Sequence, residues 1–191
     1  MSTLLLVDDN IELLELFSIF LVRAGHRVIT APGGRECLSL LQAETPDLVV
    51  LDVMMEPMDG WDTLGAIKAA ASDLPVVMLT GKQACQEELD MYGDLIEDYL
   101  RKPLTREELV AALSGVLADL SSVKEVADNA ARAGVSPELV QEYVGLRNRA
   151  ARTARLASAL ASPNLRVPEM RPGDLARLAD LEAVIGEARG Q

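Results

Sequence analysis

The chain has 191 residues, of which 49% are hydrophobic and only 3% aromatic, so it can bury a sizeable aliphatic core. Its net charge is −12, and an acidic chain of this kind should repel nucleic acid. No apolar run approaches the roughly 20 residues that cross a membrane. The first ten residues, MSTLLLVDDN, lack the basic start of a signal peptide. We therefore expect a cytoplasmic protein with no membrane partner.

The charge is unevenly distributed along the chain. Residues 1–120 hold 8 Lys and Arg against 21 Asp and Glu, whereas residues 121–191 hold 10 against 9. A change of this kind indicates a boundary between two parts. We predict one domain over residues 1–120 and a second region over residues 121–191.

Five short aliphatic runs alternate with helical patterns over the first part. The continuous apolar character of the runs is typical of buried parallel strands. Between them, apolar residues recur with i, i+3, i+4 spacing, as in amphipathic helices. This alternation predicts a doubly wound α/β fold with a five-stranded parallel sheet. The predicted strands are Thr3–Val7, Arg27–Ala31, Leu48–Leu51, Val76–Leu79 and Tyr99–Leu100.

Polar side chains follow four of these strands directly. Asp8 and Asp9 follow the first strand and Asp52 the third, while Thr80 follows the fourth and Lys102 comes just after the fifth. In a parallel sheet with the strand order 2-1-3-4-5, these side chains converge at the carboxyl edge, where such folds bind ligands. The sequence therefore predicts a functional site at this edge.

Three converging carboxylates repel one another and need a positive partner. Oxygen ligands without His or Cys favour a hard cation, Mg²⁺ or Mn²⁺. Together with a Lys ammonium and a Thr hydroxyl, such a metal site is suited to handling a phosphoryl group. The alternative is that the acids only cap helices, as Asp9 or Asn10 could do for the first helix. Capping alone leaves the Lys and the Thr unexplained.

Four motifs in order resemble the receiver domain of two-component response regulators. They are LLLVDDN, VVLDVMMEPMDG, PVVMLTGK and DYLRKP, and the resemblance covers residues 3 to about 120. It implies a flavodoxin-like fold. The stretch MEPMDGW is similar to receivers of methanogenic archaea, and it departs from the family pattern by placing Glu56 where a Pro is usual.

The resemblance implies a role for each polar residue at the predicted edge. Asp52 would accept a phosphoryl group from a histidine kinase. Asp9, Asp52 and the backbone carbonyl of Met54 would bind Mg²⁺ directly, with Asp8 acting through water. Such a protein is no enzyme in the usual sense, because it catalyses only its own Mg-dependent phosphorylation and dephosphorylation.

By the same resemblance, further residues would bind the phosphoryl group or set its lifetime. Lys102 and Thr80 would bind the phosphoryl group, and the Tyr99 ring would turn inward as Thr80 moves. Met54 and Lys82 would flank the path of the attacking water and so set the lifetime of the phosphoryl group.

The second region reads as all helical. The capping box from Thr105 to Glu108 begins a helix, and heptad spacing of apolar residues over 109–130 predicts that it continues to about residue 133. Two helices broken at Ser121-Ser122 are the alternative. The pattern leaves open whether this apolar seam pairs two chains in a dimer or packs within one.

Two more helices are predicted beyond residue 134. Ser136 and Pro137 begin the first of them, which should end before Pro163. Residues 164–173 read as a loop, and Asp174 should cap the last helix.

Three functions compete on these observations. The first is a signalling receiver whose helical region binds a protein partner or a second copy of the chain. The second is a DNA-binding transcription regulator that uses residues 121–191, where the arginines at 147, 149, 152 and 155 cluster; their spread over the helix does not favour nucleic acid as a partner. The third is a phosphatase with an Asp nucleophile, which its usual D-x-D pattern does not support, because Val53-Met54 follow Asp52.

Overall fold

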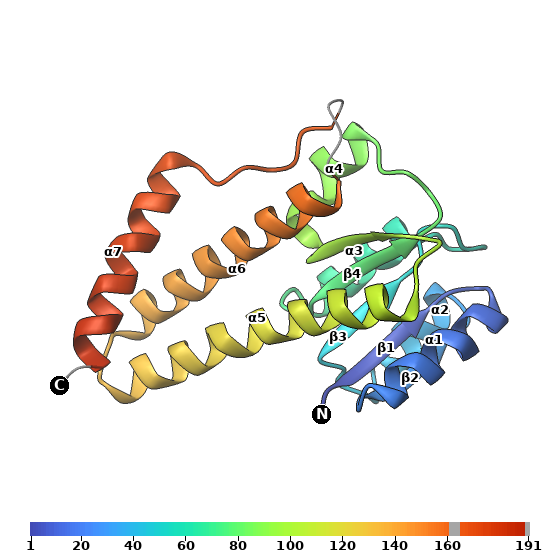
Figure 1. Cartoon of the computed structure of the whole chain (residues 1–191), viewed down its shortest axis with the longest axis horizontal. Helices are drawn as coiled ribbons and strands as arrows, with labels where there is room; N and C mark the ends of the chain where they lie inside the picture. The colour runs from blue at the N-terminus through green and yellow to red at the C-terminus, as the bar shows by residue number, and fades with distance from the viewer. Residues whose placement is uncertain (161–164, 190–191) are drawn as a thin grey trace.

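The computed structural model describes residues 1–160 and 165–189. Five parallel strands form one sheet in the order β2-β1-β3-β4-β5, which confirms the predicted topology (Figure 1). Their bounds agree with the predicted runs to within one residue: β1 Thr3–Val7, β2 Arg27–Ala31, β3 Leu48–Leu51, β4 Val76–Thr80 and β5 Asp98–Arg101.

Helices cover both faces of the sheet, because the side chains of a strand alternate between its faces. In β1, Leu4 and Leu6 pack with α1 (Ile11–Arg23) and α5 (Arg106–Arg132). The neighbouring Leu5 and Val7 face the opposite layer. That layer contains α2 Gly34–Leu40, α3 Gly60–Ala70 and α4 Gln86–Tyr92, which leads into the short 3-10 helix η1 Gly93–Leu95.

Local capping places the helices where the sequence predicted them. The Asn10 side chain accepts a hydrogen bond from the Leu13 N–H at 3.1 Å and so caps α1; Asp9 is therefore left available at the edge of the sheet. Thr105 and Glu108 form the predicted capping box at the start of α5.

The α5 helix runs for 27 residues without a break at Ser121-Ser122. Its first half buries three residues against the sheet, at positions 109, 113 and 116. Its second half buries Val123 and Ala130 in a separate apolar cluster with α6 (Pro137–Ala159) and α7 (Pro172–Arg189). The apolar seam of α5 is thus buried inside the chain. The division at residue 120 stays a prediction, because α5 crosses it.

The helices α5, α6 and α7 extend together beyond the sheet (Figure 1), and α6 returns along α5 toward β5. Ser136 caps α6 as predicted. The last helix begins at Pro172, so the prediction that Asp174 is its cap is wrong: Asp174 lies in the first turn, and its carboxylate pairs with Arg149 at 3.0 Å. Pro163 and Asn164 lie outside the described residues. Among residues 1–160 and 165–189, no helix is long and apolar enough to cross a membrane.

Candidate functional site

Three carboxylates meet at the carboxyl edge of the sheet. Asp8 and Asp9 follow β1 and Asp52 follows β3, and carboxylate oxygens of the three lie within 4.8 Å of one another. Asp8 and Asp52 are buried, with 5% and 6% of their surface exposed, whereas Asp9 is exposed. The structure therefore brings together the acids that the sequence predicted to converge.

A lysine that follows β5, an edge strand of the sheet, reaches this cluster. The Lys102 ammonium contacts the Asp8 carboxylate and lies 3.4 Å from Oδ2 of Asp52. Its backbone N–H donates to the carbonyl of Thr80 at 2.8 Å, so the end of β5 is tied to the end of β4. One cation thus faces two buried carboxylates.

The surroundings of the Asp52 carboxyl shift its pKa in opposite directions. Burial raises the pKa of Asp52 above its ordinary value, and the Asp8 carboxylate raises it as well, whereas the Lys102 ammonium lowers it. The Thr80 hydroxyl and the Met54 N–H also favour its charged form, because hydrogen bonds to a carboxylate stabilise the anion. The net direction is upward, and burial is its largest cause.

Close backbone packing fixes the position of Asp52. The Gly60 N–H donates to the Val53 carbonyl at 2.9 Å, which brings the start of α3 against the end of β3. A Cβ at position 60 would lie 2.1 Å from the Asp52 carbonyl oxygen. Only glycine allows this approach, so Gly60 is required by packing at the site itself.

A hydrogen-bond chain leads from the cluster to Tyr99. The Lys82 N–H donates to the Thr80 hydroxyl oxygen at 3.2 Å, and the Tyr99 hydroxyl donates to the Lys82 carbonyl at 2.8 Å. The Tyr99 side chain already points inward, with 2% of the residue exposed. The inward position that the resemblance implies for one state is thus the one present here.

The residues that would flank the water path differ in their contacts. Met54 is 61% exposed at the rim of the site. The Lys82 ammonium instead pairs with Glu88 at 2.5 Å. Glu88 also accepts a hydrogen bond from Trp61 Nε1 at 2.9 Å. Sequence reasoning missed Glu88, although its place three residues after Cys85, the N-cap of α4, is a capping signal.

The four clustered arginines all pair with carboxylates of the same chain. Arg147 and Arg149 face α7, with Glu182 at 4.0 Å and Asp174 at 3.0 Å, whereas the other two face the sheet. Arg152 and Arg155 both bind Glu97, at 3.0 and 2.8 Å. Glu97, just before β5, is a second residue that the sequence analysis missed, because a lone acid carries no signal.

The acidic cluster fits a hard divalent cation. Its donors are carboxylate oxygens, the preferred ligands of Mg²⁺, and two of the three carboxylates are buried beside one ammonium. The donor set and its charge therefore both suit the ion that the sequence predicted.

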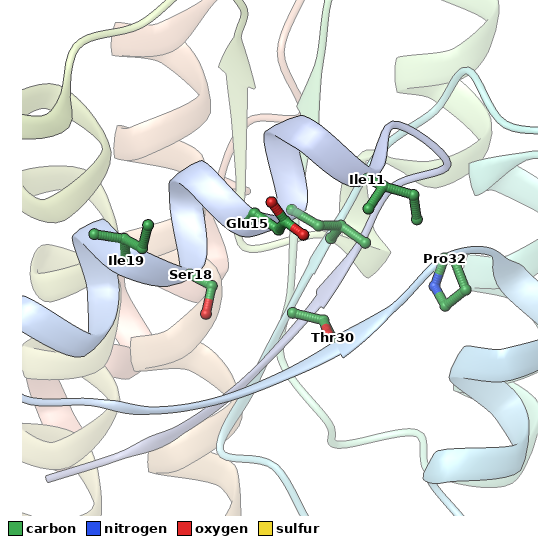
Figure 2. Close-up of a pocket in the computed structure, with 7 residues that line it drawn as sticks. Ile11, Glu15, Ser18, Ile19, Thr30 and Pro32 are labelled. Carbon is green, nitrogen blue, oxygen red and sulfur yellow. The ribbon is translucent and has the colours of Figure 1, made fainter.

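A shallow hollow lies beside the cluster, between α1 and β2 (Figure 2). It has a volume of about 450 Å³ and is lined largely by apolar groups. Ile11 and Pro32 lie at its end near the carboxyl edge of the sheet, and Ile19 lies further along α1. Ile11 and Ile19 are about half exposed, at 52% and 49%. The hollow is thus an apolar surface next to the acidic cluster.

A doubly wound 2-1-3-4-5 sheet with three acids, a threonine and a lysine at its carboxyl edge defines a receiver-type signalling domain. Residues 4–114 match the response regulator receiver domain family. The chain belongs to this family.

Relatives and solved structures agree with this assignment. The response regulator MprA of Mycolicibacterium vanbaalenii is 36% identical over 114 residues, which cover 60% of this chain and 49% of MprA. The N-terminal domain of a receiver protein from Methanoculleus marisnigri is 50% identical, with a TM-score of 0.52; the match covers 62% of this chain and 98% of that one. The response regulator TrrA of Thermotoga maritima, solved with Mg²⁺ and BeF, is 27% identical, with a TM-score of 0.56 and coverage of 61% and 99%.

The chain spans about half the length of the curated relatives it matches. Some of these relatives are named as transcriptional regulators, such as TcrX of Mycobacterium tuberculosis. Their names give no support to the expectation that nucleic acid is excluded as a partner, so that expectation has to be tested on residues 121–191 themselves.

Proposed function

We propose that the protein is a response regulator in which Asp52 accepts a phosphoryl group from a histidine kinase. The observation that carries the proposal is the convergence of Asp8, Asp9 and Asp52 within 4.8 Å, with Lys102 against two of them. Helix capping would not bring a lysine from β5 to acids that follow β1 and β3.

The chemical step is an in-line displacement at phosphorus. An oxygen of the Asp52 carboxylate forms a bond to phosphorus as the bond from phosphorus to the kinase histidine nitrogen breaks. The products are an aspartyl phosphate and a neutral histidine. Water later cleaves the acyl phosphate, which returns the carboxylate and releases inorganic phosphate. In this sense the protein catalyses only its own modification.

Mg²⁺ would be held by Asp9, Asp52 and the carbonyl of Met54, with Asp8 acting through water. When bound, the ion neutralises the carboxylates and stabilises negative charge on the oxygens of the transferring group. Asp52 is buried and points into the cluster, so its nucleophilic oxygen is oriented before the donor arrives.

Two side chains would bind the phosphoryl group on Asp52. Lys102 lies 3.4 Å from the acceptor carboxylate and would pair with the phosphoryl oxygens. The Thr80 hydroxyl would donate to one of them. Exposed Met54 would shield the phosphoryl group from water and so lengthen its life. Lys82 would affect the lifetime less directly, because its ammonium is bound to Glu88.

The kinase would contact the apolar hollow on α1. A donor histidine must approach Asp52 from the carboxyl edge of the sheet, where Ile11 and Pro32 border the hollow (Figure 2). Half-exposed apolar side chains beside a reactive site are suited to a protein partner. Replacing Ile19 with Asp should slow transfer from purified histidine kinases and leave phosphorylation by acetyl phosphate unchanged.

Asp52→Asn is the direct test of the proposal. The native protein, treated with acetyl phosphate and Mg²⁺, should gain the mass of one phosphoryl group, and EDTA should prevent the gain. The Asn variant should gain none, because an amide oxygen is a poor nucleophile. An equal mass gain in both proteins would move the acceptor elsewhere.

DNA binding through residues 121–191 is the second candidate, favoured by the names of the relatives. Against it, Arg152 and Arg155 bind Glu97 of the receiver, whereas Arg147 and Arg149 face carboxylates of α7, so the four arginines do not form one basic surface. We therefore propose a protein partner for the helical region. A gel-shift titration at several salt concentrations separates the two, since phosphate contacts give a steep salt dependence.

A further inference from the structure

The α6 helix is docked on the receiver by charge. Glu97, just before β5, is 5% exposed, and its two carboxylate oxygens accept hydrogen bonds from Arg152 at 3.0 Å and Arg155 at 2.8 Å. Arg155 Nε also donates to the Glu97 carbonyl at 3.1 Å. The docked α6 therefore both covers the Glu97 carboxylate and supplies the two cations that neutralise it.

The same helix inserts an apolar residue into the receiver core. Leu156 is 1% exposed and belongs to the cluster that contains Ile96 and Tyr99. On α6, Leu156 follows Arg155 directly, so the ion pairs and the apolar contact act at one point of the helix. The α6 helix thus covers the face of the receiver next to β5 (Figure 1).

The segment of residues 165–168, which lies beyond α6 along the chain, is fixed to α4. The Gln86 side chain donates to the Arg166 carbonyl at 3.0 Å and accepts from the Arg166 N–H at 2.7 Å. Pro168 packs so closely on Gly93 that a Cβ there would lie 2.9 Å from the proline ring. These contacts hold the segment against the side of α4.

The docked end of α6 meets the hydrogen-bond chain that starts at the acidic cluster. A cavity of about 110 Å³ is lined on one side by Tyr99 and Ala84 and on the other by Leu160 and Leu165. Tyr99 is held inward by the Lys82 carbonyl, and the Lys82 N–H is bonded to Thr80. The surface on which α6 ends is therefore built by the loop that follows Thr80.

We infer that α6 is a clasp that closes more tightly on the receiver when Asp52 is phosphorylated. The inference rests on the proposed function. A phosphoryl oxygen that accepts a hydrogen bond from the Thr80 hydroxyl would hold Thr80 in place. Because Lys82 is hydrogen-bonded to both Thr80 and Tyr99, this would also hold the Tyr99 ring inward. The Tyr99 ring and the loop that follows Thr80 form the surface that the end of α6 contacts. Phosphorylation thus stabilises the surface on which α6 is docked.

The coupling works in both directions, because linkage between two binding equilibria is reciprocal. A docked α6 keeps Tyr99 inward and the Lys82 carbonyl in place, so it should favour the arrangement that binds a phosphoryl group. Loosening α6 should therefore weaken the binding of a phosphoryl analogue at Asp52, although the two sites are on different elements.

Hydrogen–deuterium exchange on the full chain tests the clasp. The last two turns of α6 are followed with and without acetyl phosphate and Mg²⁺, while intact mass reports phosphorylation. Exchange should slow about five-fold or more on phosphorylation, the lower range of measured couplings. Mass gain with unchanged or faster exchange would overturn the clasp alone, whereas an absence of mass gain would overturn the proposed phosphorylation.

Matched substitutions test the reciprocal effect. Glu97→Gln removes the charge that holds α6 on the receiver, and the control Glu142→Gln removes an exposed pair with Arg177 at 2.7 Å between α6 and α7. Beryllofluoride affinity, followed by Trp61 fluorescence, should fall about five-fold in the first and stay unchanged in the second. If Glu97→Gln unfolds, Gln86→Ala loosens only the exposed contact with Arg166 and should also weaken binding. Unchanged affinity in a folded variant of either kind would contradict the coupling.

Discussion

The Lys102 ammonium contacts the Asp8 carboxylate and lies 3.4 Å from Asp52. Lys102 thus contacts Asp8, the acid that by resemblance acts on the metal only through water. Asp8 also accepts a hydrogen bond from the Asn10 N–H at 2.9 Å. Lys102 lies closer to Asp8 than to Asp52, so Asp8 is the better neutralised of these two acids. Asp9 is exposed and belongs to the same cluster.

Asp9→Ala should therefore reduce the Mg²⁺ affinity more than Asp8→Ala does. We expect a loss of at least about tenfold for Asp9, which corresponds to about 1.4 kcal/mol, measured by calorimetric titration. Asp8→Ala frees Lys102 and should have the smaller effect. A larger loss for Asp8→Ala would assign it, and not Asp9, as the direct ligand.

Gly60→Ala should destabilise the protein strongly, because its Cβ would lie 2.1 Å from the Asp52 carbonyl oxygen. Backbone cannot move aside as a side chain can, so we expect a cost of about 3 kcal/mol in the free energy of unfolding. Gly65 provides the control on the same helix, since a Cβ there meets nothing within 4 Å. Gly65→Ala should be stabilising by about 1 kcal/mol in the same denaturant titration.

Ser121→Pro should interrupt α5 where it leaves the sheet, at a cost of about 3 kcal/mol for an interior proline. The residues of α5 that pack on the sheet precede this point, so the receiver should still fold and accept a phosphoryl group. Any dependence of partner binding on phosphorylation should weaken. Ser121→Ala, also at an exposed position, is the control. Undiminished dependence in the Pro variant would mean that the coupling runs through the docked α6 and not along α5.

The two cysteines should differ sharply in reactivity. Burial raises the pKa of the Cys37 thiol to about 12, whereas Cys85 is exposed. At pH 8 an aromatic disulfide reagent should titrate one thiol in the folded protein and two after denaturation. The Cys85→Ser variant should show no reactive thiol until it unfolds, and rapid reaction of folded Cys85→Ser would contradict the buried assignment.

The same raised pKa predicts a pH dependence of stability. In the unfolded chain the Cys37 thiol loses its proton near pH 9, but in the folded protein it does so only near pH 12. Its contribution to stability is therefore complete below pH 9 and is lost as the pH rises from 9 toward 12. The free energy of unfolding should fall less steeply over this window in Cys37→Ala, which lacks the thiol.

The site could be predicted from the sequence because of how parallel strands are built. A strand buried on both faces reads as an uninterrupted apolar run, so Asp52 and Thr80 stand out as the first polar residues after such runs. The order of the strands then brings them together. Local signals at Thr105 and Ser136 likewise marked the starts of two helices, because a cap is a property of neighbouring residues.

The docking of α6 could not be predicted in this way. Arg152 and Arg155 read as part of a basic cluster, and their shared partner Glu97 lies 55 and 58 residues away. Pairings over such distances leave no local pattern. The inward position of Tyr99 was implied only by the resemblance, because it depends on which segments cover the ring.

Because α6 completes the receiver at Glu97, this receiver and its helical region are not interchangeable parts. A chimaera that joined residues 1–120 to a different output region would leave Glu97 without its two arginines and would uncover the apolar surface that Leu156 contacts. Grafted onto a receiver that lacks an acid at the position of Glu97, α6 would present two arginines to a surface with no matching carboxylate. The output region of this chain can therefore be exchanged only together with the corner of the sheet that it contacts.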